Sequence, residues 1–152
     1  MDIHTYLKEW AINYFKHRDI IPKNIEKVED MGERVLIWYK ERMEIILPIA
    51  DLADFNIAHK SHEFINLIIF NTHKNFETLL KNWEDFIEFK NLKIFFINPF
   101  SEADHKWIIS PSVHARISDE SSLKRGLQSI FETVPTLTDE ELEENIKAIE
   151  KI

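Results

Sequence analysis

The amino-acid sequence predicts a single α/β domain of the α+β kind, in which helices flank a mixed sheet of five or six strands. Residues 64–70 and 92–97 are short apolar runs rich in β-branched and aromatic residues, which is typical of buried strands. Between them, apolar residues recur at helical spacing over residues 76–87, so the three segments form a βαβ crossover with parallel strands. Alternating segments within residues 25–49 indicate an antiparallel meander.

The N-terminal segment is predicted to be a helix that precedes this meander. Residues 2–17 carry an apolar stripe at helical spacing, with Asp2 near the helix start, and Pro22 ends the segment. Three strands are expected next, at residues 25–31, 33–39 and 43–49. Pro48 indicates that the third strand stops there or lies at a sheet edge. Residues 50–62 lack periodicity, which predicts an irregular loop or a short helix.

One more strand is predicted after the crossover. Residues 106–110 should return antiparallel to the preceding strand, because the polar connection before them is too short for another crossover helix. We expect this strand to reach Ile117, with or without a break at Pro111. His114 and Arg116 are one pleat apart and would then share a face of the strand.

Two helices are predicted to close the chain. The first begins at the cap Ser118–Asp119 and stops at Pro135. The second begins at a capping box that starts with Thr138, and it is short, acidic and thinly apolar. We therefore expect residues 1–135 to form one α/β domain. Residues 136–152 are expected to form a C-terminal acidic helix that is part of the same domain or an assembly element.

The composition excludes several classes of protein. The chain has 152 residues and no cysteine, which excludes disulfides, thiolate zinc sites and a cysteine nucleophile. Its two glycines are too few for glycine-rich phosphate loops or dinucleotide fingerprints. The net charge of −8 disfavours nucleic acid as a partner without excluding it. The chain shows no leader or membrane segment, so we expect a cytoplasmic protein, and its Ile, Lys and Glu content is typical of a heat-adapted or AT-rich source.

Polar side chains follow both buried strands of the predicted crossover. Asn71, His73 and Lys74 come after the first strand, and Asn98 and Lys106 come after the second. Ligands in open α/β sheets bind outside the carboxyl ends of parallel strands, so these five residues are candidate ligand-binding residues. The amide groups that open the helix, together with the lysine, suit a small anion such as a carboxylate or a phosphate. The alternative is that the same residues only form caps and turns.

The order of the expected elements over residues 2–98 resembles the core of the restriction-endonuclease-like nucleases. Asp51 follows the meander, roughly where that family keeps its first metal-binding aspartate. On the next strand the family has an acidic residue, any residue and a lysine, whereas this chain has Asn-Thr-His at residues 71–73. Asp104-His105-Lys106 has the family's letters but follows a later strand.

Two functions from different classes are expected. The favoured function is a non-catalytic binding or assembly module without a cofactor, whose partner is a second copy, another protein or a small anion, because the sequence holds no complete catalytic constellation. The alternative, implied by the resemblance, is a divergent metal-dependent nuclease or phosphoesterase. Its divalent metal would be held by Asp51, Asp54 and Glu63. The sequence leaves open whether the protein is an enzyme.

Overall fold

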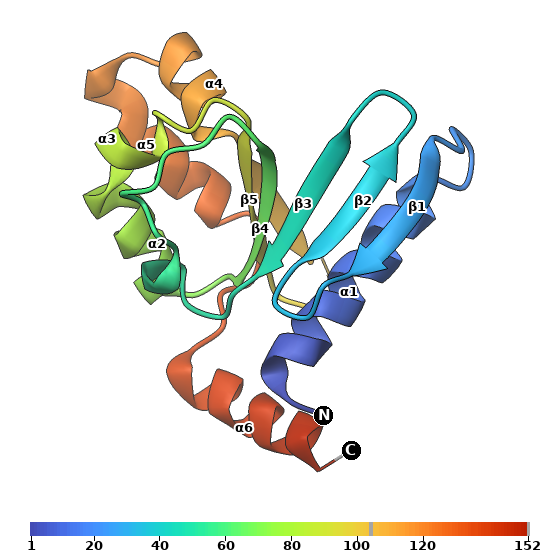
Figure 1. Ribbon diagram of the computed structural model, residues 1–152. Helices are drawn as coiled ribbons and strands as arrows, with labels where there is room; N and C mark the ends of the chain where they lie inside the picture. Colours follow the sequence, from blue (N-terminus) through green and yellow to red (C-terminus); the bar gives the residue numbers. More distant parts are fainter. Residues whose placement is uncertain (104, 152) are drawn as a thin grey trace.

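In a computed structural model, which describes residues 1–103 and 105–151, the chain forms one six-stranded sheet flanked by helices (Figure 1). The strands are β1 (Ile25–Asp30), β2 (Val35–Tyr39), β3 (Met43–Pro48), β4 (Phe64–Phe70), β5 (Leu92–Ile97) and β6 (Lys106–Ile109). The helices are α1 (Ile3–Arg18), α2 (His73–Lys81), α3 (Trp83–Phe86), α4 (Pro111–Ile117), α5 (Glu120–Phe131) and α6 (Asp139–Glu150). A 3-10 turn, η1 (Leu52–Asp54), lies between β3 and β4.

The sheet is mixed and its strands follow the order of the chain, β1-β2-β3-β4-β5-β6. β1, β2 and β3 form the predicted antiparallel meander, and β4 and β5 are parallel as the crossover pattern predicted. β6 pairs antiparallel with β5, which is also confirmed. β3 and β4 are parallel as well, although the segment that joins them contains only η1. Three neighbouring parallel strands therefore share one carboxyl edge.

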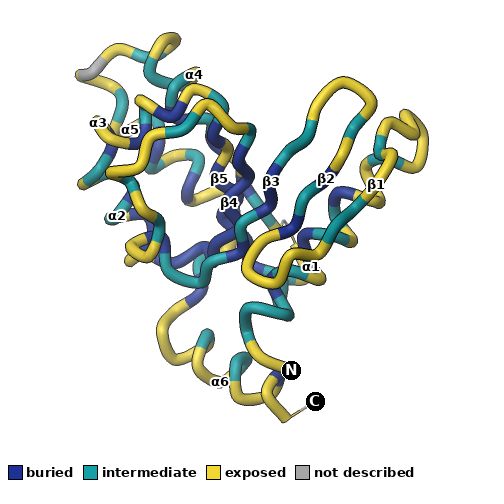
Figure 2. The backbone as a smooth tube through the Cα atoms, viewed as in Figure 1, coloured by how far each residue is buried: buried dark blue, intermediate teal, exposed yellow. Residues whose placement is uncertain are grey.

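Alternate residues of the central strands face two separate helical layers (Figure 1). On β4, Leu67 and Ile69 pack against the layer that contains α2, α3 and α5. Ile68 and Phe70 face α1 on the other side, together with Leu7 of that helix. Figure 2 shows that the buried backbone is concentrated in the central strands, whereas the hairpin tip between β2 and β3 is exposed. Burial on both faces explains why β4 and β5 are continuous apolar runs.

The crossover helix is two helices, which corrects the prediction of one continuous helix. α2 ends at Lys81 and α3 begins at Trp83, with Asn82 between them at φ −109° and ψ 23°. The Asn82 side-chain Nδ2 donates to the carbonyl oxygen of Thr78 at 3.0 Å, so the side chain competes with the backbone for a helical acceptor. The apolar stripe continues across the break, because Trp83 is buried as predicted, with 7% of its surface exposed.

Residues 111–117 form the helix α4, so the predicted continuation of β6 as a strand is wrong. Pro111 is the first residue of the helix. Proline favours the first helical turn, where its missing N–H needs no partner, and it cannot donate to a strand ladder. His114 and Arg116 therefore do not share a face of a strand, contrary to the prediction. The His114 ring instead packs edge-on against Trp83, with 5.9 Å between the ring centroids, and burial lowers its pKa.

Three of the helices begin at side-chain caps, of which Asp119 and Thr138 were predicted as caps and Asp2 only as a residue near the helix start. Asp2, Asp119 and Thr138 each accept a hydrogen bond from a backbone N–H three residues later, at 2.7, 3.0 and 3.1 Å. β3 ends at Pro48, as one of the two readings of that proline predicted, but the strand lies inside the sheet between β2 and β4. Among the described residues, no helix combines the length and the apolar composition that a membrane span requires.

The C-terminal segment packs onto the rest of the chain. Leu137 is 2% exposed and belongs to the buried cluster under α1, and Leu142 packs against the same cluster. α6 lies beside α1, with Ile149 buried (Figure 1). Its outer face is exposed (Figure 2). A role of α6 in assembly stays a prediction.

Candidate functional site

The asparagines at the carboxyl edge bind the chain's own backbone. Asn71 is fully buried, and its Oδ1 accepts a hydrogen bond from Trp107 Nε1 at 2.8 Å. Its Nδ2 donates to the carbonyl oxygens of Val134 at 3.1 Å and Pro135 at 3.3 Å. Asn98 Nδ2 donates to the same Pro135 oxygen at 2.9 Å. These two predicted ligand-binding residues therefore converge on the segment between α5 and α6, which occupies the place where a ligand was expected.

A third asparagine, Asn75 in the first turn of α2, ties the end of β3 to the edge in the same way. Its Nδ2 donates to the carbonyl oxygens of Ala50 at 3.1 Å and Phe70 at 2.9 Å, and its Oδ1 accepts from Leu52 N at 2.9 Å. The Asn75 amide thus makes three of its four possible hydrogen bonds, and only one lone pair of Oδ1 is free. The carboxyl edge of the sheet is closed by internal hydrogen bonds.

Lys74 is exposed at this edge and pairs with Asp51. The distance from Lys74 Nζ to Asp51 Oδ2 is 2.5 Å. The hydrogen bond from Lys74 lowers the pKa of Asp51, and the same bond raises the pKa of Lys74, with further contributions from Asp139 and Asp54. Lys74 thus lies among three carboxylates, so an anion that bound there would first have to displace Asp51.

The remaining predicted anion-site residues are dispersed. The His73 ring packs edge-on against Phe131, with 5.1 Å between the ring centroids. Lys106 lies on the α1 side of the sheet, where its Nζ is 5.0 Å from the centre of the Tyr14 ring, a cation–π distance. The two side chains thus contact different helical layers and do not form one site.

The predicted metal ligands are not brought together. Asp51 follows β3 and Glu63 precedes β4, and because these strands are parallel the two residues lie at opposite ends of them. The seven residues of β4 span roughly 20 Å at the usual rise per residue. Asp54 and Glu63 both line a groove of about 520 Å³ on the α2 side of β3. Among the described side chains, which leave out Asp104, Glu120 and Ile152, no three His, Asp or Glu residues are grouped so that they could hold a metal ion.

A different set of polar residues lies near the starts of the three parallel strands. Glu44 of β3, Asn66 of β4 and Lys93 of β5 all face the α1 side, because Ile46, Ile68 and Phe95 two residues later do so. Asn66 is directly opposite Lys93 in the register of β4 and β5. Its Nδ2 donates to Glu44 Oε1 at 3.0 Å. We call these three residues the polar row.

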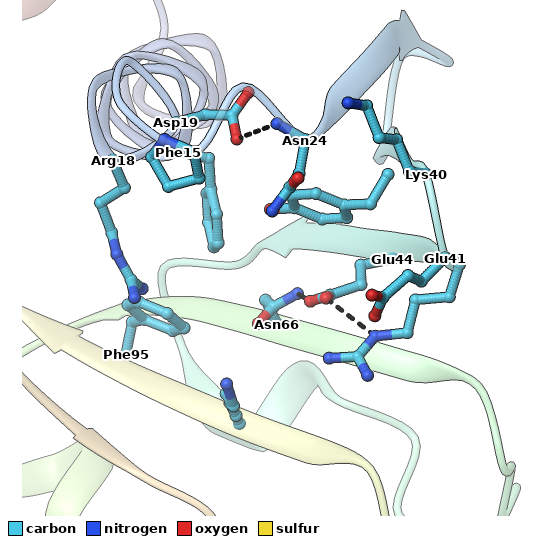
Figure 3. Close-up of a pocket in the computed structure, with 13 residues that line it drawn as sticks. Phe15, Arg18, Asp19, Asn24, Lys40, Glu41, Glu44, Asn66 and Phe95 are labelled. Carbon is cyan, nitrogen blue, oxygen red and sulfur yellow. Dashed lines mark hydrogen bonds and ion pairs between the residues drawn. The ribbon is translucent and has the colours of Figure 1, made fainter.

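The polar row is the floor of a cavity of about 310 Å³ (Figure 3). α1 covers the later parts of the strands through Leu7, Ala11 and Phe15 but ends at Arg18, so it does not reach the polar row. The turn between β2 and β3 forms the opposite wall. The lining residues are Phe15, Arg18, Asp19, Pro22, Asn24, Tyr39, Lys40, Glu41, Arg42, Glu44, Asn66, Lys93 and Phe95.

Four cationic side chains and three carboxylates line this cavity, so its lining carries a net positive charge. Arg42 Nε bonds Glu44 Oε2 at 3.1 Å, which neutralises one cation. Arg18, Lys40 and Lys93 form no ion pair with any carboxylate of the described residues. The Arg18 guanidinium donates a hydrogen bond to the Tyr14 hydroxyl, at 3.4 Å.

In the cavity wall, Tyr39 has a raised pKa and Asp19 holds the turn after α1. Burial, followed by the charges of Glu44 and Asp19, raises the pKa of Tyr39 to about 12, so its hydroxyl is neutral at physiological pH. The Asp19 carboxylate accepts hydrogen bonds from the backbone N–H groups of Asn24 at 2.8 Å and Ile25 at 2.9 Å. These bonds fix the turn after α1 and hence the shape of the cavity mouth.

No family model, no curated protein and no solved structure matches this chain. The residues of the polar row are not among the candidate residues predicted from the sequence, although a signal for them exists. Each of three otherwise apolar strands carries one polar residue near its start, and a buried one among them, such as Asn66, needs a specific partner.

Proposed function

We propose that this protein is a binding module for a small organic anion, and that the anion binds in the cavity above the polar row. The observation that carries the proposal is that Arg18, Lys40 and Lys93 line one cavity without a carboxylate partner in a chain of net charge −8. After Arg42 and Glu44 are paired, these three cations face only two carboxylates, Asp19 and Glu41, so the cavity keeps a net positive charge that an anion would neutralise. The proposal concerns binding and includes no catalytic step.

The size and lining of the cavity support a small molecule as the ligand. Its volume of about 310 Å³ is at the lower end of the usual range for ligand pockets. Phe15, Tyr39 and Phe95 supply apolar surface, and the charged groups supply orientation. The predicted anion site at Lys74 is less suitable, because that lysine is already paired with Asp51.

The proposal is tested by calorimetric titration with inorganic phosphate, succinate and glutarate, at constant ionic strength so that general exclusion of salts from the surface does not contribute. We expect at least one of these anions to bind the wild-type protein and to raise its melting temperature. Lys93→Gln should weaken that binding about tenfold, since a hydrogen bond to a charged group contributes roughly 1.5 kcal/mol or more.

Two matched variants control for the loss of charge. Lys74→Gln removes the cation of the carboxyl edge, and Lys124→Gln removes an exposed cation of α5; both should bind the anion as the wild type does. Equal weakening by Lys74→Gln and Lys93→Gln would show that only net charge matters. Absence of binding by every anion would overturn the proposed function.

A further inference from the structure

The amide of the nearly buried Asn66 leaves its oxygen acceptor without a partner in the described part of the protein. The residue is 3% exposed. One end of its amide faces Glu44 Oε1 at 3.0 Å and the Ile45 carbonyl oxygen at 3.3 Å. Both partners are acceptors, so this end is the NH₂ group and the other end is Oδ1. Within the described residues, no donor bonds this Oδ1.

The unpaired Oδ1 faces the cavity. Every fully buried side-chain polar atom of the described residues has a hydrogen-bond partner. An Asn66 oxygen without a partner must therefore keep contact with open space, and the open space beside Asn66 is the cavity that it lines. A nearly buried acceptor favours a ligand that brings a hydrogen-bond donor.

Carboxylates and cations lie on both sides of the cavity. Figure 3 shows Glu41 and Glu44 on the same side as the Asn66 amide, with Lys40 on the same turn as Glu41, whereas Asp19 and Arg18 lie together at the end of α1 on the opposite side. Glu41 forms no ion pair with a cation of the described residues. Asp19 forms no ion pair with a described cation either, so three unpaired cations and two unpaired carboxylates, Asp19 and Glu41, surround the same space.

We propose that the ligand is an acidic zwitterion, a small molecule with two anionic groups and one primary ammonium group. This inference rests on the proposed function, because it assigns a ligand class to the same cavity. The ammonium group donates to Asn66 Oδ1 and pairs with Glu41, and the anionic groups pair with Arg18, Lys40 and Lys93. Such a ligand matches both the excess of positive charge and the unpaired Asn66 oxygen. The anionic groups are carboxylates in an acidic amino acid, or a phosphate and a carboxylate in a phosphorylated one.

Matched pairs of ligands isolate the ammonium group. L-Glutamate and glutarate differ by that group, as do L-aspartate and succinate, and O-phospho-L-serine is the phosphorylated arm. We expect calorimetry to show that one amino acid binds the wild-type protein about tenfold or more tightly than its matched dicarboxylate, because it adds a charge-assisted hydrogen bond. The arm that binds more tightly, carboxylate or phosphate, identifies the source of the second anionic group.

Two variants test the residues assigned to the ammonium group. Asn66→Ala and Glu41→Gln should each reduce the ratio between an amino acid and its matched dicarboxylate towards one, while binding of the dicarboxylate persists. Glu41 is exposed, so Glu41→Gln keeps the test valid if Asn66→Ala does not fold. Glu84→Gln, an exposed substitution on α3, is the matched control and should leave the ratio unchanged.

The possible failures are distinguishable. If the dicarboxylates bind as tightly as the amino acids, the cavity binds anions and the zwitterion assignment is wrong, whereas the proposed function stands. If neither the dicarboxylates, the amino acids nor phosphate bind, both the proposed function and this assignment are overturned. A ratio that falls equally in Glu84→Gln and Glu41→Gln contradicts the assignment of Glu41.

Discussion

Asparagines lie at both ends of the same parallel strands, but their side chains have different hydrogen-bond partners at the two ends. At the carboxyl edge, Asn71, Asn75 and Asn98 bond the backbone of segments that lie against the edge. Near the strand starts, Asn66 bonds Glu44 and keeps its oxygen towards an open cavity. The carboxyl ends of parallel strands are the usual place for a ligand, but here the chain itself fills that place.

The difference follows from where unpaired backbone groups lie. Each irregular segment that packs against the sheet carries carbonyl and N–H groups that need partners when they are buried. The segment at Val134 and Pro135 and the segment at Ala50 and Leu52 both lie against the carboxyl edge, and asparagine side chains satisfy them. No comparable described segment lies over the polar row, because α1 ends at Arg18.

The comparison predicts that Asn71 matters far more for stability than Asn66. Asn71→Ala leaves the buried Trp107 N–H and the Val134 carbonyl group without their side-chain partner, whereas the Pro135 carbonyl group keeps its bond from Asn98. We expect the free energy of unfolding to fall by about 3 to 5 kcal/mol in denaturant titration. Asn66→Ala is the matched substitution, and we expect a loss of about 1 kcal/mol, because water in the cavity can replace the lost bonds. Equal losses in the two variants would refute the distinction between a closed edge and an open cavity.

A smaller but still large effect is expected at Leu137, which follows the segment that Asn71 and Asn98 hold. Its side chain is buried under α1, and its backbone N donates to the Asn71 carbonyl oxygen at 2.9 Å. Leu137→Ala should therefore cost about 2 to 4 kcal/mol of unfolding free energy, the usual range for a buried leucine. Leu142→Ala on α6 is the control and should cost less, because Leu142 is only partly buried. A loss at Leu137 no larger than that at Leu142 would show that this segment does not close the carboxyl edge.

The smallest predicted effect is a pH dependence at Tyr39 in the cavity wall. Its pKa in the folded protein is raised from 10.0 to about 12, chiefly by burial, so the folded state holds the proton more tightly than the unfolded state. The stability contribution is fully present below pH 10.0 and is lost as the pH rises to about 12. We expect the unfolding free energy of the wild type to fall more steeply over this interval than that of Tyr39→Phe. Parallel pH profiles of the two proteins would contradict the raised pKa.

Much of the fold was predictable because it depends on short-range patterns. The buried strands β4 and β5 and the stripe of α1 follow from the spacing of apolar residues, and the caps Asp119 and Thr138 follow from residue type. The wrong predictions of secondary structure fall where a local sequence pattern is compatible with two structures. Pro111 can end a strand or begin a helix, and it begins α4. The apolar stripe continues past Asn82, so the stripe alone did not indicate that the helix breaks there, where the Asn82 side chain bonds the Thr78 carbonyl oxygen.

The candidate site was less predictable than the fold. The sequence located the polar residues of the carboxyl edge correctly, since Asn71 and Asn98 do converge once β4 and β5 are parallel. It could not show that Pro135 reaches the same point. The polar row went unnoticed because its members belong to three separate strands, and their proximity depends on the register between those strands.

The sequence by itself thus determined which segments are helices and strands, with the exceptions above, and which residues are polar within apolar runs. Only the tertiary structure decided which of those polar residues are already bonded. Asn71 and its partner Val134 are 63 positions apart, so no local pattern connects them. A side chain is available to a ligand only if no other part of the chain has taken its hydrogen bonds, and that depends on contacts between residues far apart in sequence. For this reason Asn71 and Asn66, alike in type and burial, differ in what they can bind.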